Sequence, residues 1–177
     1  MVLRVSGLSV RSNIKFVVGF TDDETVMLDF DCTPFKTVRY WAFRVMKWFR
    51  LEGFVILKSS TRNYHVVFNR RVSWRENMRV VAWVSLLSHN PMLEKWFVMQ
   101  CIKEASTLRV SPKRDKPTPR IVFRFGEQNG QIREFLRYRR LVKGILRKFT
   151  VENSGLVNDR LVESTVFPLE ATMESTV

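Results

Sequence analysis

The chain has 177 residues, of which 45% are apolar and 27% are charged, and this composition predicts one domain with a core of ordinary size. No run approaches the roughly 18 apolar residues of a membrane span, and the N-terminus lacks the long apolar segment of a signal peptide. We therefore expect a cytoplasmic protein with no membrane partner. Cys32 and Cys101 are too few for a disulfide framework, and we expect both to be small buried apolar residues.

The charge is distributed unevenly along the chain. Residues 1–150 carry 29 of the 30 Lys and Arg residues and 12 of the 17 acids, whereas residues 151–177 have a net charge of −4. A basic domain of this kind attracts a polyanion through counterion release, and nucleic acid is the commonest one. The alternative is a solvated basic surface without such a partner. We expect a domain over 1–150 and an acidic tail over 151–177 that is either disordered or folded back on the basic surface.

The first elements are two strands and a helix. Apolar alternation predicts strands at 14–20 and 25–31, joined by the acidic turn 21–24. Thr33 and Pro34 are typical of a helix N-cap and first residue, and Gly53 suits the C-terminal cap. We expect the apolar stripe of this helix to pack in the core rather than to stack bases. The stripe consists of Val38, Trp41, Ala42, Val45, Trp48 and Phe49.

The remaining elements alternate between strand and helix patterns. Ser73 and Glu76 form a capping box, and Asn90-Pro91 is typical of a helix start. Strands are predicted at 54–60, 64–70, 106–111 and 120–125, and helices at 77–87, 91–104 and 131–149. This order predicts an α+β fold, with an antiparallel sheet and helices packed mainly on one face.

Asp29 and Asp31 are the strongest candidates for a functional site. Residues two apart on a strand point to the same face, so both carboxylates face one spot. Two like charges so placed are costly unless a divalent cation lies between them. An Asp-x-Asp pair on a strand is a weak signal by itself, and a metal site at Asp29 and Asp31 is the hypothesis that we carry forward.

Three segments in order resemble the archaeo-eukaryotic primase superfamily, over about residues 14–125. They are Leu28-Asp29-Phe30-Asp31, Ser59-Ser60-Thr61-Arg62-Asn63-Tyr64-His65-Val66 and Thr107-Leu108-Arg109-Val110-Ser111-Pro112-Lys113. The resemblance implies an RRM-like catalytic sheet with Mg²⁺ or Mn²⁺ at Asp29 and Asp31, and with His65 as a third catalytic residue. The nucleotide contacts that it implies are Ser60, Arg62, His65, Arg109 and Lys113. The family's third acid has one candidate here, Glu104, for which an exposed helix-terminal glutamate is the alternative.

Two functions are compatible with these residues. The first is a metal-dependent, template-directed nucleotidyltransferase, a DNA primase or primer-polymerase that uses single-stranded DNA and nucleoside triphosphates, with other replication proteins as further partners. The second is a non-catalytic RRM-like module or accessory primase subunit that binds single-stranded nucleic acid. A replication-initiator nuclease is disfavoured because it needs a His-hydrophobic-His pair, and the only histidines are His65 and His89.

Overall fold

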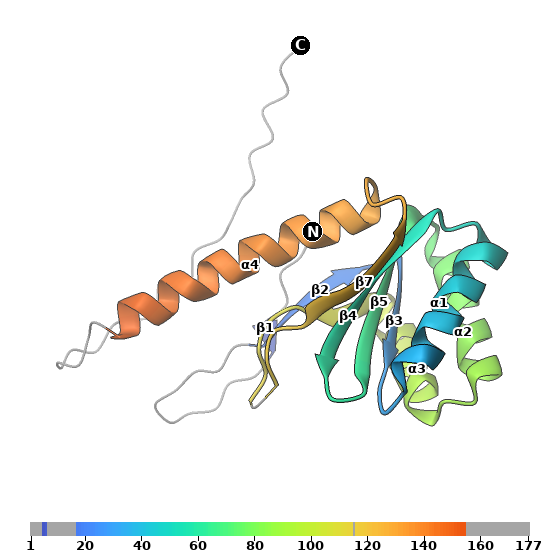
Figure 1. Ribbon diagram of the computed structural model, residues 1–177, viewed down its shortest axis with the longest axis horizontal. Helices are drawn as coiled ribbons and strands as arrows, with labels where there is room; N and C mark the ends of the chain where they lie inside the picture. The colour runs from blue at the N-terminus through green and yellow to red at the C-terminus, as the bar shows by residue number, and fades with distance from the viewer. Residues whose placement is uncertain (1–4, 7–16, 115, 155–177) are drawn as a thin grey trace, which may run out of the picture.

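The computed structural model describes residues 5–6, 17–114 and 116–154 (Figure 1). The strands are β1 (Val5–Ser6), β2 (Val17–Asp22), β3 (Thr25–Phe30), β4 (Gly53–Ser60), β5 (Asn63–Arg71), β6 (Ser106–Arg109) and β7 (Arg120–Gly126). The helices are α1 (Phe35–Phe49), α2 (Trp74–Ser88), α3 (Pro91–Lys103) and α4 (Gln131–Ser154). From β2 onward the element order predicted from sequence is confirmed, with ends that shift by a few residues, whereas β1 was not predicted. Residues 14–16 of the first predicted strand lie outside the described residues.

The strands form two antiparallel sheets. One has the order β1-β2-β6 and the other has the order β3-β5-β4-β7. The turn between β2 and β3 joins the two sheets, and β6, which pairs with β2, also contacts β3. Strand alternation then gives each sheet two faces that need covering. The predicted α+β class is confirmed.

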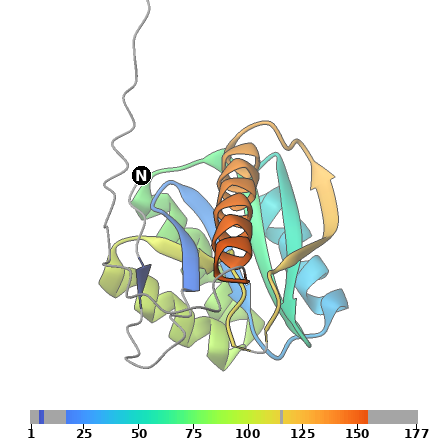
Figure 2. The same cartoon turned by 90° about the vertical axis from the view of Figure 1, so that its left-hand side faces the viewer.

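Helices α1, α2 and α3 cover one face of the β3-β5-β4-β7 sheet, as Figures 1 and 2 show. Val38 of α1, Val80 of α2 and Leu93 of α3 are buried in one apolar cluster. The strands contribute every second residue to this cluster, including Leu28, Phe30, Ile56, Val66 and Phe68. The prediction of helices mainly on one face is therefore confirmed.

Helix α4 covers the opposite face of the sheet (Figure 2). Its buried residues Ile132, Phe135, Tyr138 and Val142 have the i, i+3, i+4 spacing of an amphipathic helix. They pack on the alternate strand residues, which are Met27, Val55, Leu57 and Val67, and on Phe20 of β2 and Leu108 of β6. This second core joins both sheets under one helix.

The predicted start signals of α2 and α3 are confirmed. The Ser73 side chain accepts a hydrogen bond of 3.2 Å from the backbone N–H of Glu76. Asn90 Oδ1 accepts bonds of 3.0 and 3.3 Å from the N–H groups of Met92 and Leu93. These side chains satisfy N–H groups that a helix start leaves without partners.

The predicted caps of α1 are wrong. Pro34 occupies the N-cap and Arg50 is the C-cap with a left-handed φ of 53°. Thr33 instead donates from its hydroxyl to the carbonyl of Asp31 at 2.9 Å. Gly53 belongs to β4, where a Cβ would lie 2.2 Å from the carbonyl oxygen of Glu127. Glycine is required there by the close approach of β7's end rather than by a helix end.

Two predictions of burial are also wrong. Cys32 and Cys101 are both exposed, because Cys32 follows the end of β3 and Cys101 lies on the outer side of α3. Trp48 is 51% exposed, although Val38, Ala42 and Val45 of the same predicted stripe are buried. The stripe is wider than the contact with the sheet, so its edge remains at the surface.

Helix α4 continues past residue 150, the expected end of the domain, to Ser154. The rest of the acidic tail lies outside the described residues. Within the described part, none of the helices combines the length and the apolar character needed to cross a bilayer.

Candidate active site

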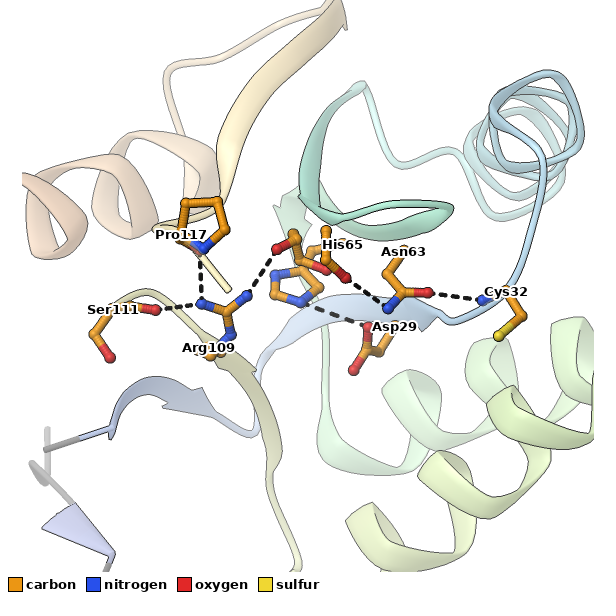
Figure 3. A network of polar contacts seen from close by, with 9 residues as sticks. Asp29, Cys32, Asn63, His65, Arg109, Ser111 and Pro117 are labelled. Atoms are coloured by element: carbon orange, nitrogen blue, oxygen red, sulfur yellow. Dashed lines mark hydrogen bonds and ion pairs between the residues drawn. The ribbon is translucent and has the colours of Figure 1, made fainter. Parts of the chain in front are cut away.

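Asp29 and His65 form a cross-strand pair at the end of β3 and β5 (Figure 3). Asp29 is two residues beyond Met27, and His65 is two residues before Val67, so both lie on the sheet face that α4 partly covers. His65 Nε2 lies 3.5 Å from Asp29 Oδ1. The strand ladder therefore fixes the separation of this carboxyl group and this imidazole.

The imidazole of this pair is almost fully buried, and the carboxyl group is partly exposed. The His65 side chain is 4% exposed and the Asp29 side chain is 24% exposed. Asp29 Oδ1 and His65 Nδ1 are nevertheless buried without a hydrogen-bond partner. A buried polar atom without a partner costs free energy, and such atoms are concentrated at functional sites.

The two pKa values shift in opposite directions. Burial, helped by repulsion from Asp31, raises the pKa of Asp29 to about 7, against the attraction of Arg109 and Lys116. Burial and the charge of Arg109 lower the pKa of His65 to about 3. At neutral pH the imidazole is neutral and the carboxyl group is close to its titration midpoint. Strong shifts of this kind are typical of functional sites.

Arg109 of β6 lies beside this pair and links three chain segments (Figure 3). Its guanidinium donates to the carbonyl oxygens of Ser59 and Pro117, both at 2.9 Å, and to that of Ser111. Three of its five N–H groups are thus engaged by backbone. The arginine is held in place near Asp29 and keeps N–H groups for another acceptor.

The turn between β4 and β5 is bonded to the end of β3. Asn63 donates to Ser60 Oγ at 2.7 Å and accepts from the N–H of Cys32 at 2.8 Å. Arg62 accepts on its carbonyl from the N–H of Thr33 at 2.8 Å, and its side chain donates to the carbonyl of Cys32 at 3.3 Å. These bonds hold Ser60 and Arg62 next to the chain segment that carries Asp31.

A basic hollow of about 480 Å³ opens between the end of β4 and the segment before β7. Its lining residues are Lys58, Ser59, Ser60, Thr61, Lys116, Pro117, Thr118 and Arg120. Cations and hydroxyl groups together suit a phosphate-bearing ligand. Lys116, which lines the hollow, also acts to lower the pKa of Asp29 through its charge. The hollow and the Asp29–His65 pair are therefore electrostatically connected.

Lys58, Lys116 and Arg120 of the hollow were not predicted from the sequence. The chain has 30 Lys and Arg residues, and nothing local distinguishes the few that share a hollow. Only the Pro- and Lys-rich composition of residues 112–119 could have indicated a basic loop near the site.

Two of the predicted site residues lie elsewhere. Lys113 is exposed and pairs through its backbone with Lys116 at 2.9 Å, and its side chain does not line the hollow. Glu104 is the exposed C-cap of α3, with a left-handed φ of 55°. In the described part of the chain, Asp29 and Asp31 do not belong to a group of three His, Cys, Asp or Glu residues whose ligand atoms all lie within 4.8 Å of one another. His65 is close to Asp29 but does not complete such a group.

The acids that do form such a group in the described ranges are Asp22, Asp23 and Glu24 at the other end of β3. Two of them already have protein partners. Asp22 accepts from Thr25 and from Gln131, and Glu24 pairs with Arg71 at 2.7 Å. The closeness of these acids therefore has a structural reason, because their hydrogen bonds and ion pair stabilise the turn between β2 and β3.

Comparison with protein families, curated proteins and solved structures finds no match to this chain. At one end of the sheet, Asp31, Arg109 and Lys116 act on the charge of Asp29, Arg109 also acts on that of His65, and the basic hollow adjoins these residues. This combination suits a ligand that carries both phosphates and a divalent cation.

Proposed function

We propose that the protein is a template-directed nucleotidyltransferase of the primase type, acting in the cytoplasm on single-stranded DNA and nucleoside triphosphates. The observation that carries the proposal is the state of Asp29. Its Oδ1 is buried without a hydrogen-bond partner, and its pKa is raised by burial and by the nearby Asp31. A divalent cation at this point would relieve both costs.

The donor atoms suit Mg²⁺ or Mn²⁺. Asp29 and Asp31 offer carboxylate oxygens, which these hard cations prefer, and Mg²⁺ usually keeps several water molecules and takes further oxygens from substrate phosphates. Two protein carboxylates are therefore a sufficient protein share of the ligand set. When bound, such an ion favours the alkoxide of the attacking 3′ hydroxyl and neutralises charge on the triphosphate.

The basic residues of the site supply the rest of the electrostatics. In nucleotidyl transfer, the 3′ oxygen bonds to the α-phosphorus as the bond to pyrophosphate breaks, so negative charge grows on the leaving group. We assign Lys58, Lys116 and Arg120 to the β- and γ-phosphates, with Ser60 and Arg109 next to them. Catalysis of this kind is mostly positioning and charge stabilisation. Neutral His65 lies beside Asp29 on the neighbouring strand and keeps water away from that side of the carboxyl group.

A second candidate is a non-catalytic module that binds single-stranded nucleic acid, for example an accessory primase subunit. The position of Glu104 away from the paired acids favours it, because among the described residues the third acid that the primase resemblance implies is then missing from the site. The engagement of Arg109 by three backbone carbonyls points in the same direction.

Primer extension tests the proposal. With a single-stranded template, a primer, nucleotides and Mn²⁺, we expect the wild type to make product. Asp29→Asn and Asp31→Asn should each lower the rate at least about 100-fold, because a metal ligand is lost. Asp23→Asn is the matched control, since it removes an exposed acid at the other end of β3.

The outcome separates the two candidates. Product from the wild type and from Asp23→Asn, but not from the Asp29 and Asp31 variants, supports the enzyme. Tight binding of DNA by the wild type, with no product under Mg²⁺ or Mn²⁺, would favour the binding module. Equal activity in all variants would refute the assignment of the site.

A further inference from the structure

Helix α1 presents a regular column of side chains to solvent. Lys36, Tyr40, Arg44 and Trp48 follow one another at intervals of four residues, so they lie one above the other on a single side of the helix. Tyr40 and Trp48 are each 51% exposed. We call these four residues the aromatic column.

Contacts within the aromatic column order its rings. The Arg44 guanidinium carbon lies 5.6 Å from the Tyr40 ring centre and 4.6 Å from the Trp48 ring centre. Arg44 Nε is buried without a hydrogen-bond partner, and the guanidinium lies over both rings. Trp48 also contacts Trp83 of α2, with ring centres 4.3 Å apart. Both exposed rings are thus held in place before any ligand arrives, which lowers the entropy cost of binding.

The charge around the column has one sign. Residues 35–50 contain five cations, Lys36, Arg39, Arg44, Lys47 and Arg50, and no acid. Such a surface attracts a polyanion. Flat exposed rings beside cations are the combination that stacks bases and follows phosphates in proteins that bind single strands. With five cations and no acid, this surface fits a polyanion such as a nucleic acid better than a protein surface of mixed charge.

We propose that the aromatic column is a second nucleic-acid site, which binds single-stranded DNA or RNA by stacking unpaired bases on Tyr40 and Trp48. A duplex cannot stack on these rings, because its bases are already stacked on one another. The aromatic column lies on the side of the sheet that α1, α2 and α3 cover, whereas Asp29 and His65 lie on the side that α4 covers. The site is therefore separate from the proposed active site and does not depend on catalysis. A nucleic-acid strand bound there would lie on the opposite side of the sheet from the proposed active site.

Binding of a labelled single-stranded oligonucleotide, followed by fluorescence anisotropy, tests this site. Tyr40→Ala and Trp48→Ala should each weaken binding about tenfold, because a stacked base is lost. Trp48→Phe keeps a ring and should retain most of the affinity. Ile102→Ala is the matched control, since Ile102 is 71% exposed on α3 and has no ring. Thermal melting checks that each variant is folded.

Two further measurements make the test specific. The single strand should quench Trp48 fluorescence, seen as the difference between the wild type and Trp48→Phe, and an abasic strand should not. The alanine effects should persist in an Asp29→Asn background, which separates this site from the active site. Unchanged affinity in both alanine variants, or equal loss with an abasic strand, would overturn the proposal. Capture of a protein by the column with no response to oligonucleotides would also overturn it.

Discussion

At Asp29, burial and a neighbouring carboxylate both disfavour the charged form, whereas at His65 burial and Arg109 disfavour the protonated form. The two side chains face each other across one strand pair, and their shifts have opposite signs. Each shift therefore gives the stability of the fold its own dependence on pH.

The pH dependence of stability follows from the sign of each shift. Asp29 titrates at about 7 in the fold against an ordinary value of 3.8, so the folded state holds an extra proton between these values and stability falls as the pH rises. His65 titrates at about 3 against 6.5, so the unfolded state holds the extra proton and stability rises with pH. The two slopes oppose each other between about pH 4 and pH 6.5.

Asp29→Asn should remove one of these slopes. The free energy of unfolding should then rise from about pH 4 to pH 6.5, and at pH 8 the variant should exceed the wild type by on the order of 1–3 kcal/mol. Urea unfolding at several pH values measures this. His65→Asn should show the opposite slope, a fall between about pH 4 and pH 7. Identical pH profiles for the wild type and both variants would contradict the burial of this pair.

Divalent cations should stabilise the wild type in a pH-dependent way. A cation binds the ionised carboxylates, so its effect should grow as the pH rises through the Asp29 pKa of about 7. The rise in melting temperature with Mn²⁺ should be larger at pH 8 than at pH 6, and Asp29→Asn should remove the difference. An equal rise in Asp29→Asn would mean that the cation binds elsewhere.

Among the elements, α4 determines whether the second face of the sheet is covered. Phe135 is fully buried and meets Phe20 of β2 edge to face, with ring centres 5.2 Å apart. Phe135→Ala should lower the free energy of unfolding by about 3–5 kcal/mol, because a large side chain leaves a cavity. Leu141→Ala is the control, since Leu141 is 59% exposed on the same helix. Chemical denaturation of both variants measures the difference.

The helices and most strands were predictable because their signals are local. Ser73, Asn90 and Pro91 mark helix starts through bonds within a few residues. The cap of α1 was mispredicted because Gly53 looks like a helix end, although its reason is the close approach of Glu127, far along the chain. The pairing of β6 with β2 and the position of α4 are also long-range, and no local pattern contains them.

For the molecule as a whole, charge should govern binding of nucleic acid. Exposed cations lie on α1 and also on α4, where Arg137 and Arg140 face solvent. Affinity for a single strand should fall steeply with salt, and Arg140→Gln should reduce the slope of log K against log salt by roughly 0.7 if it contacts one phosphate. Glu134→Gln, an exposed acid on the same helix, should not reduce it. A flat salt response would refute electrostatic binding.

Only part of the candidate site could be predicted from the sequence. The strand period predicted that Asp29 and Asp31 share one face, although β3 ends at Phe30, one residue before Asp31, and the resemblance to primases brought in His65 and Arg109. The structure places these residues near one another. The basic hollow needs residues from β4 and from the segment before β7, and this proximity arises from the fold.

The division into two sheets makes Arg109 a link between them. Asp29 and His65 belong to one hydrogen-bonded ladder, whereas Arg109 lies on β6, which pairs with β2 in the other sheet. Its guanidinium donates to the carbonyl of Ser59 on β4, so it fastens the second sheet to the first beside the carboxyl–imidazole pair. Substitution of Arg109 would therefore remove a cation near Asp29 and a tie between the sheets at the same time.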